Sequence, residues 1–180
     1  MKLDIRFHYP YVITREACQK IKTDPYVQAA FARILQKELP KEGKFLLLPV
    51  PAHTGKPTYT SVVATRMEVT NWNPHVKLKV FNETTCKPRE SLCILKRAGE
   101  PLPDAIEFHI DDDGRKSIND LVAQGYQPVV IDNVIDTGRT AMAMQEAVGH
   151  PCWFMCLGLT GHFNIHTHEY IPDKSNYRTA

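Results

Sequence analysis

The sequence of 180 residues lacks long apolar runs, a marked charge of one sign and a paired set of cysteines. No segment is apolar for long enough to cross a bilayer, and charged residues stand where a signal peptide would need its apolar stretch. The formal net charge is only +2, and no run of lysines and arginines marks a nucleic-acid surface. We therefore expect a soluble protein that binds neither membranes nor nucleic acid.

The five cysteines are odd in number and never spaced as CxxC. They predict neither a disulfide framework nor a zinc site, and they indicate a reducing compartment, which we take to be the cytoplasm. Cys152 and Cys156 fall on one face of a predicted strand, too far apart along it to bond, and are expected in the core. The chain also lacks repeats and low-complexity linkers, and its length suits one domain.

What the sequence does contain is an alternation of short helical and strand patterns. Asp24 and Pro25 have the N-cap and first-position signature of a helix whose apolar spacing runs to Pro40. The apolar run at 44–51 is typical of the central strand of a parallel sheet, and 59–67 has the spacing of another helix. Further strands are expected at 75–81, 127–134 and 152–159, and further helices at 118–124 and 141–148.

This order of elements predicts an α/β fold, a doubly wound and mainly parallel sheet flanked by helices. Ser117 is the expected N-cap of the helix at 118–124, and Gly125 is its expected C-terminal stop. Two short apolar stretches between 91 and 115 are ambiguous, because they fit either two sheet strands or a projecting hairpin.

The most informative stretch is VVIDNVIDTGRT, residues 129–140. An apolar strand pattern leads to Asp132 and Asn133, and a short loop then enters a predicted helix. Open α/β sheets bind ligands at the carboxyl ends of their strands, and the amides and dipole of a helix N-terminus attract anions. Asp132 and Asn133 are placed to accept hydrogen bonds from vicinal hydroxyls or to hold a metal-bound water. The predicted phosphate loop consists of Asp136, Thr137, Gly138, Arg139 and Thr140.

In order and spacing, this stretch resembles the phosphoribosyl-diphosphate (PRPP) signature of the type I phosphoribosyltransferases. The resemblance implies a single domain over residues 1–180, with a small hood built from about 1–40 and 162–180. It implies that Asp132 and Asn133 hold the ribose and that the DTGRT loop holds the 5-phosphate. Magnesium would accompany the diphosphate, with Asp132 as its ligand, directly or through water.

The resemblance also identifies two further groups of residues. The loop after the first central strand would bind the leaving diphosphate with a hydroxyl, exposed amides and a charge, supplied by Thr54, Gly55 and Lys56. Lys96 and Arg97 would be the cations of a mobile loop that closes over the site. The competing interpretations are a plain surface turn for the first group and an ordinary surface pair for the second.

The function that the resemblance implies is that of a pentosyltransferase, within the glycosyltransferases. The enzyme would transfer phosphoribosyl from PRPP to a nucleobase or related nitrogen acceptor and release diphosphate. Asp136 would contact or deprotonate the incoming base and is the expected catalytic residue, and Phe163 or His162 would stack on that base. Magnesium is the expected cofactor, PRPP and a nucleobase-like molecule are the expected ligands, and a homodimer is a possible assembly.

Asn133 departs from the family pattern, which usually has two acidic residues at this point. Asparagine keeps a carbonyl acceptor but loses the charge, so metal binding and transition-state stabilisation would weaken. The phosphate loop is unaffected. The alternative prediction is therefore a non-catalytic regulatory protein of the same fold that binds PRPP or a nucleotide.

Other patterns have simpler interpretations. An ordinary capped strand-to-helix turn is the competing explanation of DNVIDTGRT. GKPT is excluded as a nucleoside-triphosphate loop, because Val50 stands where that motif needs a glycine. Trp153 is expected either in the core or in the wall of the site. His162, His166 and His168 are assigned to a polar tail rather than a metal site, and Asp111, Asp112 and Asp113 to a solvated turn.

Overall fold

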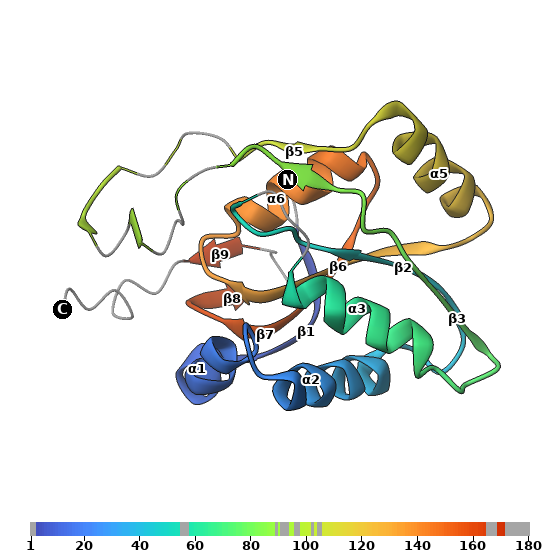
Figure 1. The fold of residues 1–180 in the computed structure, drawn as a ribbon, viewed down its shortest axis with the longest axis horizontal. Helices are drawn as coiled ribbons and strands as arrows, with labels where there is room; N and C mark the ends of the chain where they lie inside the picture. Colours follow the sequence, from blue (N-terminus) through green and yellow to red (C-terminus); the bar gives the residue numbers. More distant parts are fainter. Residues whose placement is uncertain are drawn as a thin grey trace.

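The centre of the molecule is a five-stranded sheet with the strand order β1-β7-β6-β2-β3 (Figure 1). The computed structural model describes residues 3–54, 58–88, 90, 94–95, 98–101, 103, 106–164 and 169–171, and for 162–164 and 169–171 it describes the backbone only. Every pair of neighbouring strands in the sheet is parallel. The prediction of a mainly parallel sheet is therefore confirmed.

From α2 onward, the elements follow the alternation that the sequence predicts, whereas β1 and α1 were not predicted. The strands of the sheet are β1 (Asp4–Pro10), β2 (Gly43–Pro49), β3 (Val76–Val80), β6 (Gln127–Ile135) and β7 (Trp153–Leu159). The helices are α1 (Tyr11–Lys20), α2 (Pro25–Glu38), α3 (Tyr59–Val69), α5 (Asp112–Ala123) and α6 (Arg139–Val148). Within the described ranges, no helix has the length and apolarity that crossing a membrane requires.

Helices cover both faces of the sheet (Figure 1). α1, α2 and α3 pack on one face, around a core that includes the buried Phe31 and Ile131. α5 and α6 pack on the other face, around a core that includes Leu48 and Met144. β2 and β6 are central strands, so their buried residues are apolar toward both faces. The fold is a doubly wound α/β fold, as predicted.

α2 begins where the sequence predicts. The Asp24 side chain accepts hydrogen bonds from the amides of Tyr26 at 2.8 Å and Val27 at 3.3 Å. Pro25 occupies the first helical position, where a missing amide costs no helical hydrogen bond. Leu39 ends the helix in an extended conformation. The start of this helix is thus determined by local capping.

The helix predicted to begin after Ser117 starts earlier. α5 begins at Asp112, and its N-cap is Asp111, whose side chain accepts a hydrogen bond from the amide of Gly114 at 2.7 Å. Asp112 and Asp113 occupy the first turn, where negative charge interacts favourably with the helix dipole. The three aspartates are exposed, as predicted, but they form a capped helix start and not a turn.

Residues 4–38 do not form the hood that we predicted for about 1–40. β1 is an edge strand of the main sheet, paired with β7, and α1 and α2 belong to a helical layer (Figure 1). The reason is the apolar content of β1, because Ile5 packs against one core and Phe7 is buried in the other. From the other predicted part of the hood, β8 (His162–Asn164) and β9 (Glu169–Ile171) form a separate antiparallel ribbon.

The chain between β3 and α5 projects from the sheet. β4 (Thr85–Cys86) and β5 (Phe108–His109) pair antiparallel as a ribbon that is separate from the main sheet. β4 and β5 form a hairpin, but only β5 lies in the ambiguous segment, so neither interpretation of that segment as a whole is confirmed. Cys86 Sγ donates to the carbonyl oxygen of Ala52 at 2.9 Å. This contact joins the base of the hairpin to the loop that follows β2.

Candidate ligand site at the carboxyl edge of the sheet

The order in which strands are added reverses between β2 and β6. β3 lies on one side of β2, whereas β6 and then β7 lie on the other side. The chain leaves β2 for α3 on one face of the sheet and leaves β6 for α6 on the other face. Open α/β sheets bind ligands at such a reversal, beyond the carboxyl ends of the strands. We refer to this region, beyond Pro49 of β2 and Ile135 of β6, as the crevice. Both predicted phosphate loops leave the sheet at this crevice.

β2 and β6 remain paired up to the start of the crevice. Pro49 lies opposite Ile131, and the amide of Val50 donates to the carbonyl oxygen of Ile131 at 3.0 Å. Asp132 follows directly, so it lies beside the start of the loop after β2. The buried Thr60 hydroxyl donates to the carbonyl oxygen of Val50 at 2.7 Å and fixes this loop to the first turn of α3. The structure therefore brings the predicted ribose residues next to the predicted diphosphate loop.

Of the predicted diphosphate residues, the structure describes Thr54, which is exposed in a turn. The loop ends at Thr58, the N-cap of α3, whose side chain accepts a hydrogen bond from the amide of Thr60 at 3.4 Å. The other two predicted diphosphate residues, Gly55 and Lys56, lie outside the described residues, as do the predicted cations Lys96 and Arg97.

The predicted 5-phosphate loop connects β6 to α6 through a glycine. Gly138 is the N-cap of α6, with a φ of 73° in the left-handed region, and a Cβ there would lie 3.3 Å from Leu3 Cδ1. Thr137 Oγ1 accepts a long hydrogen bond of 3.5 Å from the amide of Arg139. The N-cap has no side chain that could bond the first-turn amides, and amides at a helix N-terminus suit an anion. Thr140 lies partly buried in the same turn.

Asp136 is held by the residue that follows β7. The buried Thr160 donates its hydroxyl to Asp136 Oδ1 at 2.6 Å, and its amide donates to the carbonyl oxygen of Ile135 at 3.0 Å. The predicted catalytic carboxylate therefore lies at the carboxyl ends of β6 and β7. Arg139 extends elsewhere, because its Nη1 donates to the carbonyl oxygen of Pro103 at 2.9 Å. Its guanidinium thus contacts the projecting hairpin.

Asp132 lies in a partly buried position that disfavours its charge. Burial raises the pKa of this carboxyl to about 6, against the opposing effect of hydrogen bonds from the amides of Asn133 and Val134. Burial also raises the pKa of the Tyr59 phenol and of the Cys156 thiol, and the charge of Asp132 adds to both shifts. Tyr59 and Cys156, which lie near the predicted ribose carboxylate, are therefore disfavoured in their negatively charged forms.

The side chain of Asn133 forms a hydrogen bond with the backbone of α1. Its Nδ2 donates to the carbonyl oxygen of Cys18 at 3.3 Å, across 115 positions of sequence. Sequence reasoning missed Cys18, Tyr59 and Thr160 as neighbours of the site. Thr160 could have been found from the sequence, because it directly follows the predicted strand at 152–159 and therefore lies at its carboxyl end. The other two could not, since only the packing of α1 and α3 brings them to the crevice.

The residues present fit a magnesium ion that binds together with a diphosphate. In the part of the chain that the structure describes, no group of three or more His, Cys, Asp and Glu side chains could hold a metal. Magnesium in proteins is commonly bound by one or two carboxylates together with phosphate oxygens and waters. Asp132 supplies one such carboxylate. Two of the three histidines considered at the sequence level, His166 and His168, lie outside the described residues.

Trp153 does not line the crevice. It is the first residue of β7, at the opposite end of the strand from Gly158 and Leu159. Its ring packs on Phe45 with ring centroids 5.7 Å apart, and the Arg6 guanidinium lies 4.4 Å from the ring centroid. Of the two expectations for Trp153, the wall of the site is therefore excluded.

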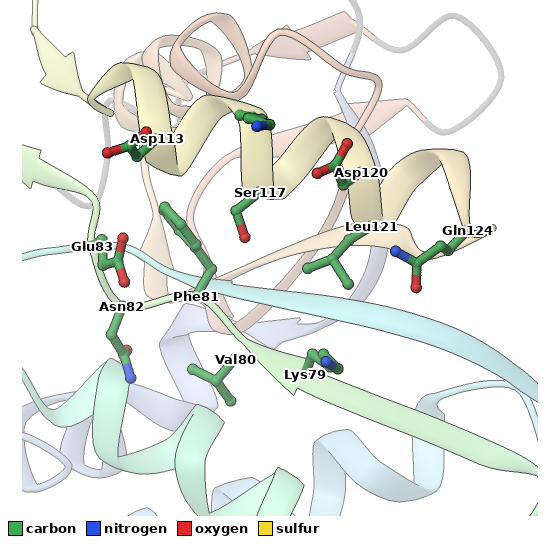
Figure 2. Close-up of a pocket in the computed structure, with 11 residues that line it drawn as sticks. Lys79, Val80, Phe81, Asn82, Glu83, Asp113, Ser117, Asp120, Leu121 and Gln124 are labelled. Carbon is green, nitrogen blue, oxygen red and sulfur yellow. The ribbon is translucent and has the colours of Figure 1, made fainter.

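A separate cavity of about 680 Å³ lies between β3 and α5 (Figure 2). Figure 2 shows Phe81 standing between the strand and Ser117 of the helix, with Lys79, Glu83 and Asp120 around it. None of its 11 lining residues belongs to the predicted phosphate loops. The charged and amide side chains that line it are exposed, so this groove gives no indication of a particular ligand.

Comparisons with known proteins assign no family. No family model matches the chain, and no curated protein matches it. Among solved structures, one match is a hypothetical protein from Neisseria gonorrhoeae with bound ppGpp, with 13% sequence identity, a TM-score of 0.32, and coverage of 89% of this chain and 72% of that chain. A TM-score of this size carries no argument about fold or ligand. The α/β assignment therefore rests on the strand order and the two helical layers of the chain itself.

Proposed function

We propose that this protein is a phosphoribosyltransferase that binds PRPP in the crevice between β2 and β6. It transfers the phosphoribosyl group to a nitrogen of a nucleobase or related acceptor and releases diphosphate. One observation carries the proposal. The loop with PRPP-like spacing, 136–140, leaves the sheet at the strand reversal and enters α6 through a left-handed glycine.

Each part of PRPP has a counterpart in the crevice. The 5-phosphate would accept hydrogen bonds from the first-turn amides of α6 and from the hydroxyls of Thr137 and Thr140. The Asp132 carboxylate would accept hydrogen bonds from the ribose hydroxyls. The diphosphate would lie toward the loop after β2, where Thr54, Gly55 and Lys56 are its predicted partners.

The proposed reaction requires placement and charge stabilisation more than a strong base. The bond from the anomeric carbon to the diphosphate oxygen breaks as the acceptor nitrogen bonds to that carbon, through a cationic ribose. Magnesium, when bound, would neutralise charge on the leaving diphosphate. Asp136 would accept a hydrogen bond from the acceptor, and the Thr160 hydroxyl would keep this carboxylate in position.

A second candidate function is favoured by the position of Asn133. Its side chain is bound to α1, which leaves a single carboxylate, Asp132, where the family resemblance implies a pair. A protein of this kind could bind PRPP or a nucleotide without transferring the phosphoribosyl group. That candidate is a regulatory binding protein.

The test is titration of the protein with PRPP and magnesium, followed by incubation with a panel of bases while diphosphate release is measured. We expect saturable PRPP binding and release with at least one base. Thr137→Ala should weaken PRPP binding about tenfold, because a hydrogen bond to a charged phosphate is lost. Thr70→Ala is the matched control, since this exposed hydroxyl donates to the carbonyl oxygen of Arg66 at the end of α3. Binding without release with any base would favour the regulatory protein, and absence of PRPP binding would exclude both the transferase and a regulator that binds PRPP.

A further inference from the structure

Asn133 joins β6 to α1 by a reciprocal contact. Its Nδ2 donates to the carbonyl oxygen of Cys18 at 3.3 Å, and Cys18 Sγ donates to the carbonyl oxygen of Asn133 at 3.8 Å. Cys18 lies in the last turn of α1, where carbonyl groups have no following helical turn to bond them. The asparagine amide therefore caps the carboxyl end of this helix from a distant strand.

The same residue orients Asp132 through its main chain. The amide of Asn133 donates to Asp132 Oδ1 at 2.7 Å. A shift of Asn133 away from α1 would therefore move one of the two backbone amides that donate to the Asp132 carboxylate. The contact with α1 and the orientation of the carboxylate depend on one residue, Asn133.

An aspartate at position 133 could not make this contact. A carboxylate only accepts hydrogen bonds, and it would face the carbonyl oxygen of Cys18, which is itself an acceptor. It would also stand at the negative end of the α1 dipole and beside the partly buried Asp132. Position 133 therefore suits an amide and disfavours an acid.

α1 has little freedom to compensate by moving. It packs closely on Gly158 of β7, where a Cβ would lie 2.9 Å from Cys18 Sγ, 3.0 Å from Tyr11 Cδ2 and 3.1 Å from Thr14 Oγ1. The helix is therefore confined by the glycine on β7 and by Asn133 on β6.

We infer that Asn133 is a positioning residue, which fastens α1 to β6 and thereby holds Asp132 in its orientation at the crevice. As far as PRPP is concerned, this inference rests on the proposed function. The docking of α1 excludes a second acid at position 133. Restoring the acidic pair would weaken the site rather than improve it.

The first test measures hydrogen exchange of α1 in the full chain. In Asn133→Asp, the α1 amides should exchange about fivefold faster or more, and in Asn133→Ala the increase should be smaller, because no repulsive charge is added. Asn82→Asp is the matched control: it adds the same charge at an exposed position in the β3–α5 groove and should leave α1 unchanged. If Asn133→Asp does not fold, Asn133→Ala supplies the measurement. Unchanged α1 exchange in the folded position 133 variants would overturn the inference.

The second test separates positioning from general loss of structure by a double-mutant cycle on PRPP binding with magnesium. Asn133→Ala should weaken binding about fivefold in the wild-type background and less than about twofold in the Asp132→Asn background, because its effect acts through Asp132. Additive losses would contradict the coupling. Tighter PRPP binding or faster diphosphate release in Asn133→Asp would overturn the inference outright. If the wild-type protein binds no PRPP, the proposed function fails, while α1 exchange still decides whether Asn133 fastens the helix.

Discussion

At the scale of single residues, Asp132 lowers the stability of the fold near neutral pH. Its pKa is about 6 in the folded protein, against 3.8 for an ordinary aspartate. Between these two values, the folded state keeps a proton that the unfolded chain has released. Stability therefore falls as the pH rises from about 4 to about 6, and the loss remains at higher pH. This position is typical of a carboxylate kept for its chemistry rather than for stability.

Replacing Asp132 by asparagine removes this cost. We expect Asp132→Asn to be more stable than the wild type by about 1–3 kcal/mol at pH 7.5 and little different at pH 3.5. Urea unfolding of both proteins at the two pH values measures the difference. Asp120→Asn is the control, because Asp120 is exposed on α5. The same stability difference at both pH values would contradict the burial of the Asp132 charge.

Substitution of the two glycines at the ends of α6 distinguishes a loss caused by backbone strain from a loss caused by damage to the phosphate loop. Gly138 and Gly149 both adopt the left-handed conformation, with φ values of 73° and 74°. A Cβ at Gly149 would meet nothing within 4 Å, whereas one at Gly138 would contact Leu3. Gly149→Ala should therefore cost about 1 kcal/mol through strain alone. Gly138→Ala should cost more and should also weaken PRPP binding, as measured by denaturation and titration. Equal losses of stability and unchanged binding would show that the loop has no special role.

At the scale of elements, the sequence and the structure give different N-caps for α5: Ser117 was predicted, and Asp111 is observed. Asp111→Ala should lower the free energy of unfolding by about 1 kcal/mol, because the cap to the amide of Gly114 is lost. Ser117→Ala should change it by no more than a few tenths of a kcal/mol, because Ser117 lies exposed inside the helix. Thermal or urea unfolding measures both. A larger loss in Ser117→Ala would restore the original prediction of Ser117 as the cap.

The start of α5 was not predicted because the local sequence around it is typical of a turn. Aspartates followed by glycine favour a turn when no other contact is considered. In the structure, a Cβ at Gly114 would lie 2.8 Å from Phe81 Cζ, so the glycine allows the first turn of α5 to pack on the chain after β3. The early start of the helix therefore depends on this tertiary contact together with the Asp111 cap. α2 needs no such contact, and its start could be predicted from Asp24 and Pro25.

At the scale of the whole molecule, the N-terminal unit is joined to the sheet by close packing on β7. Gly158→Ala should destabilise the fold by about 1–3 kcal/mol, because the added Cβ would press on three side chains of α1. The loss should be smaller in a Cys18→Ala background, since Cys18 Sγ is the nearest of these atoms at 2.9 Å. Denaturation of the two single variants and the double variant measures this coupling. Additive losses would mean that α1 does not restrict the space beside Gly158.

The contrast between β1 and β6 explains how much of the fold could be predicted. β6 carries a continuous apolar run and a loop with a chemical signature, and both its strand and its exit to α6 were predicted. β1 carries charged and aromatic residues in an irregular order, and its register against β7 shifts at two places. An edge strand of this kind depends on its neighbour, so residues 4–10 were assigned to a hood and not to the sheet.

The sequence by itself determined the order of the main helices and strands from α2 onward, the two central strands and the loop at 136–140, because periodicity, capping and turn chemistry are local properties. Only the tertiary structure decided what the site residues contact. The strand order places Thr160 on Asp136, and the docking of α1 places Cys18 on Asn133. Contacts between residues this far apart depend on how the sheet is assembled. No local pattern records that assembly, so the part played by Asn133 became visible only in the fold.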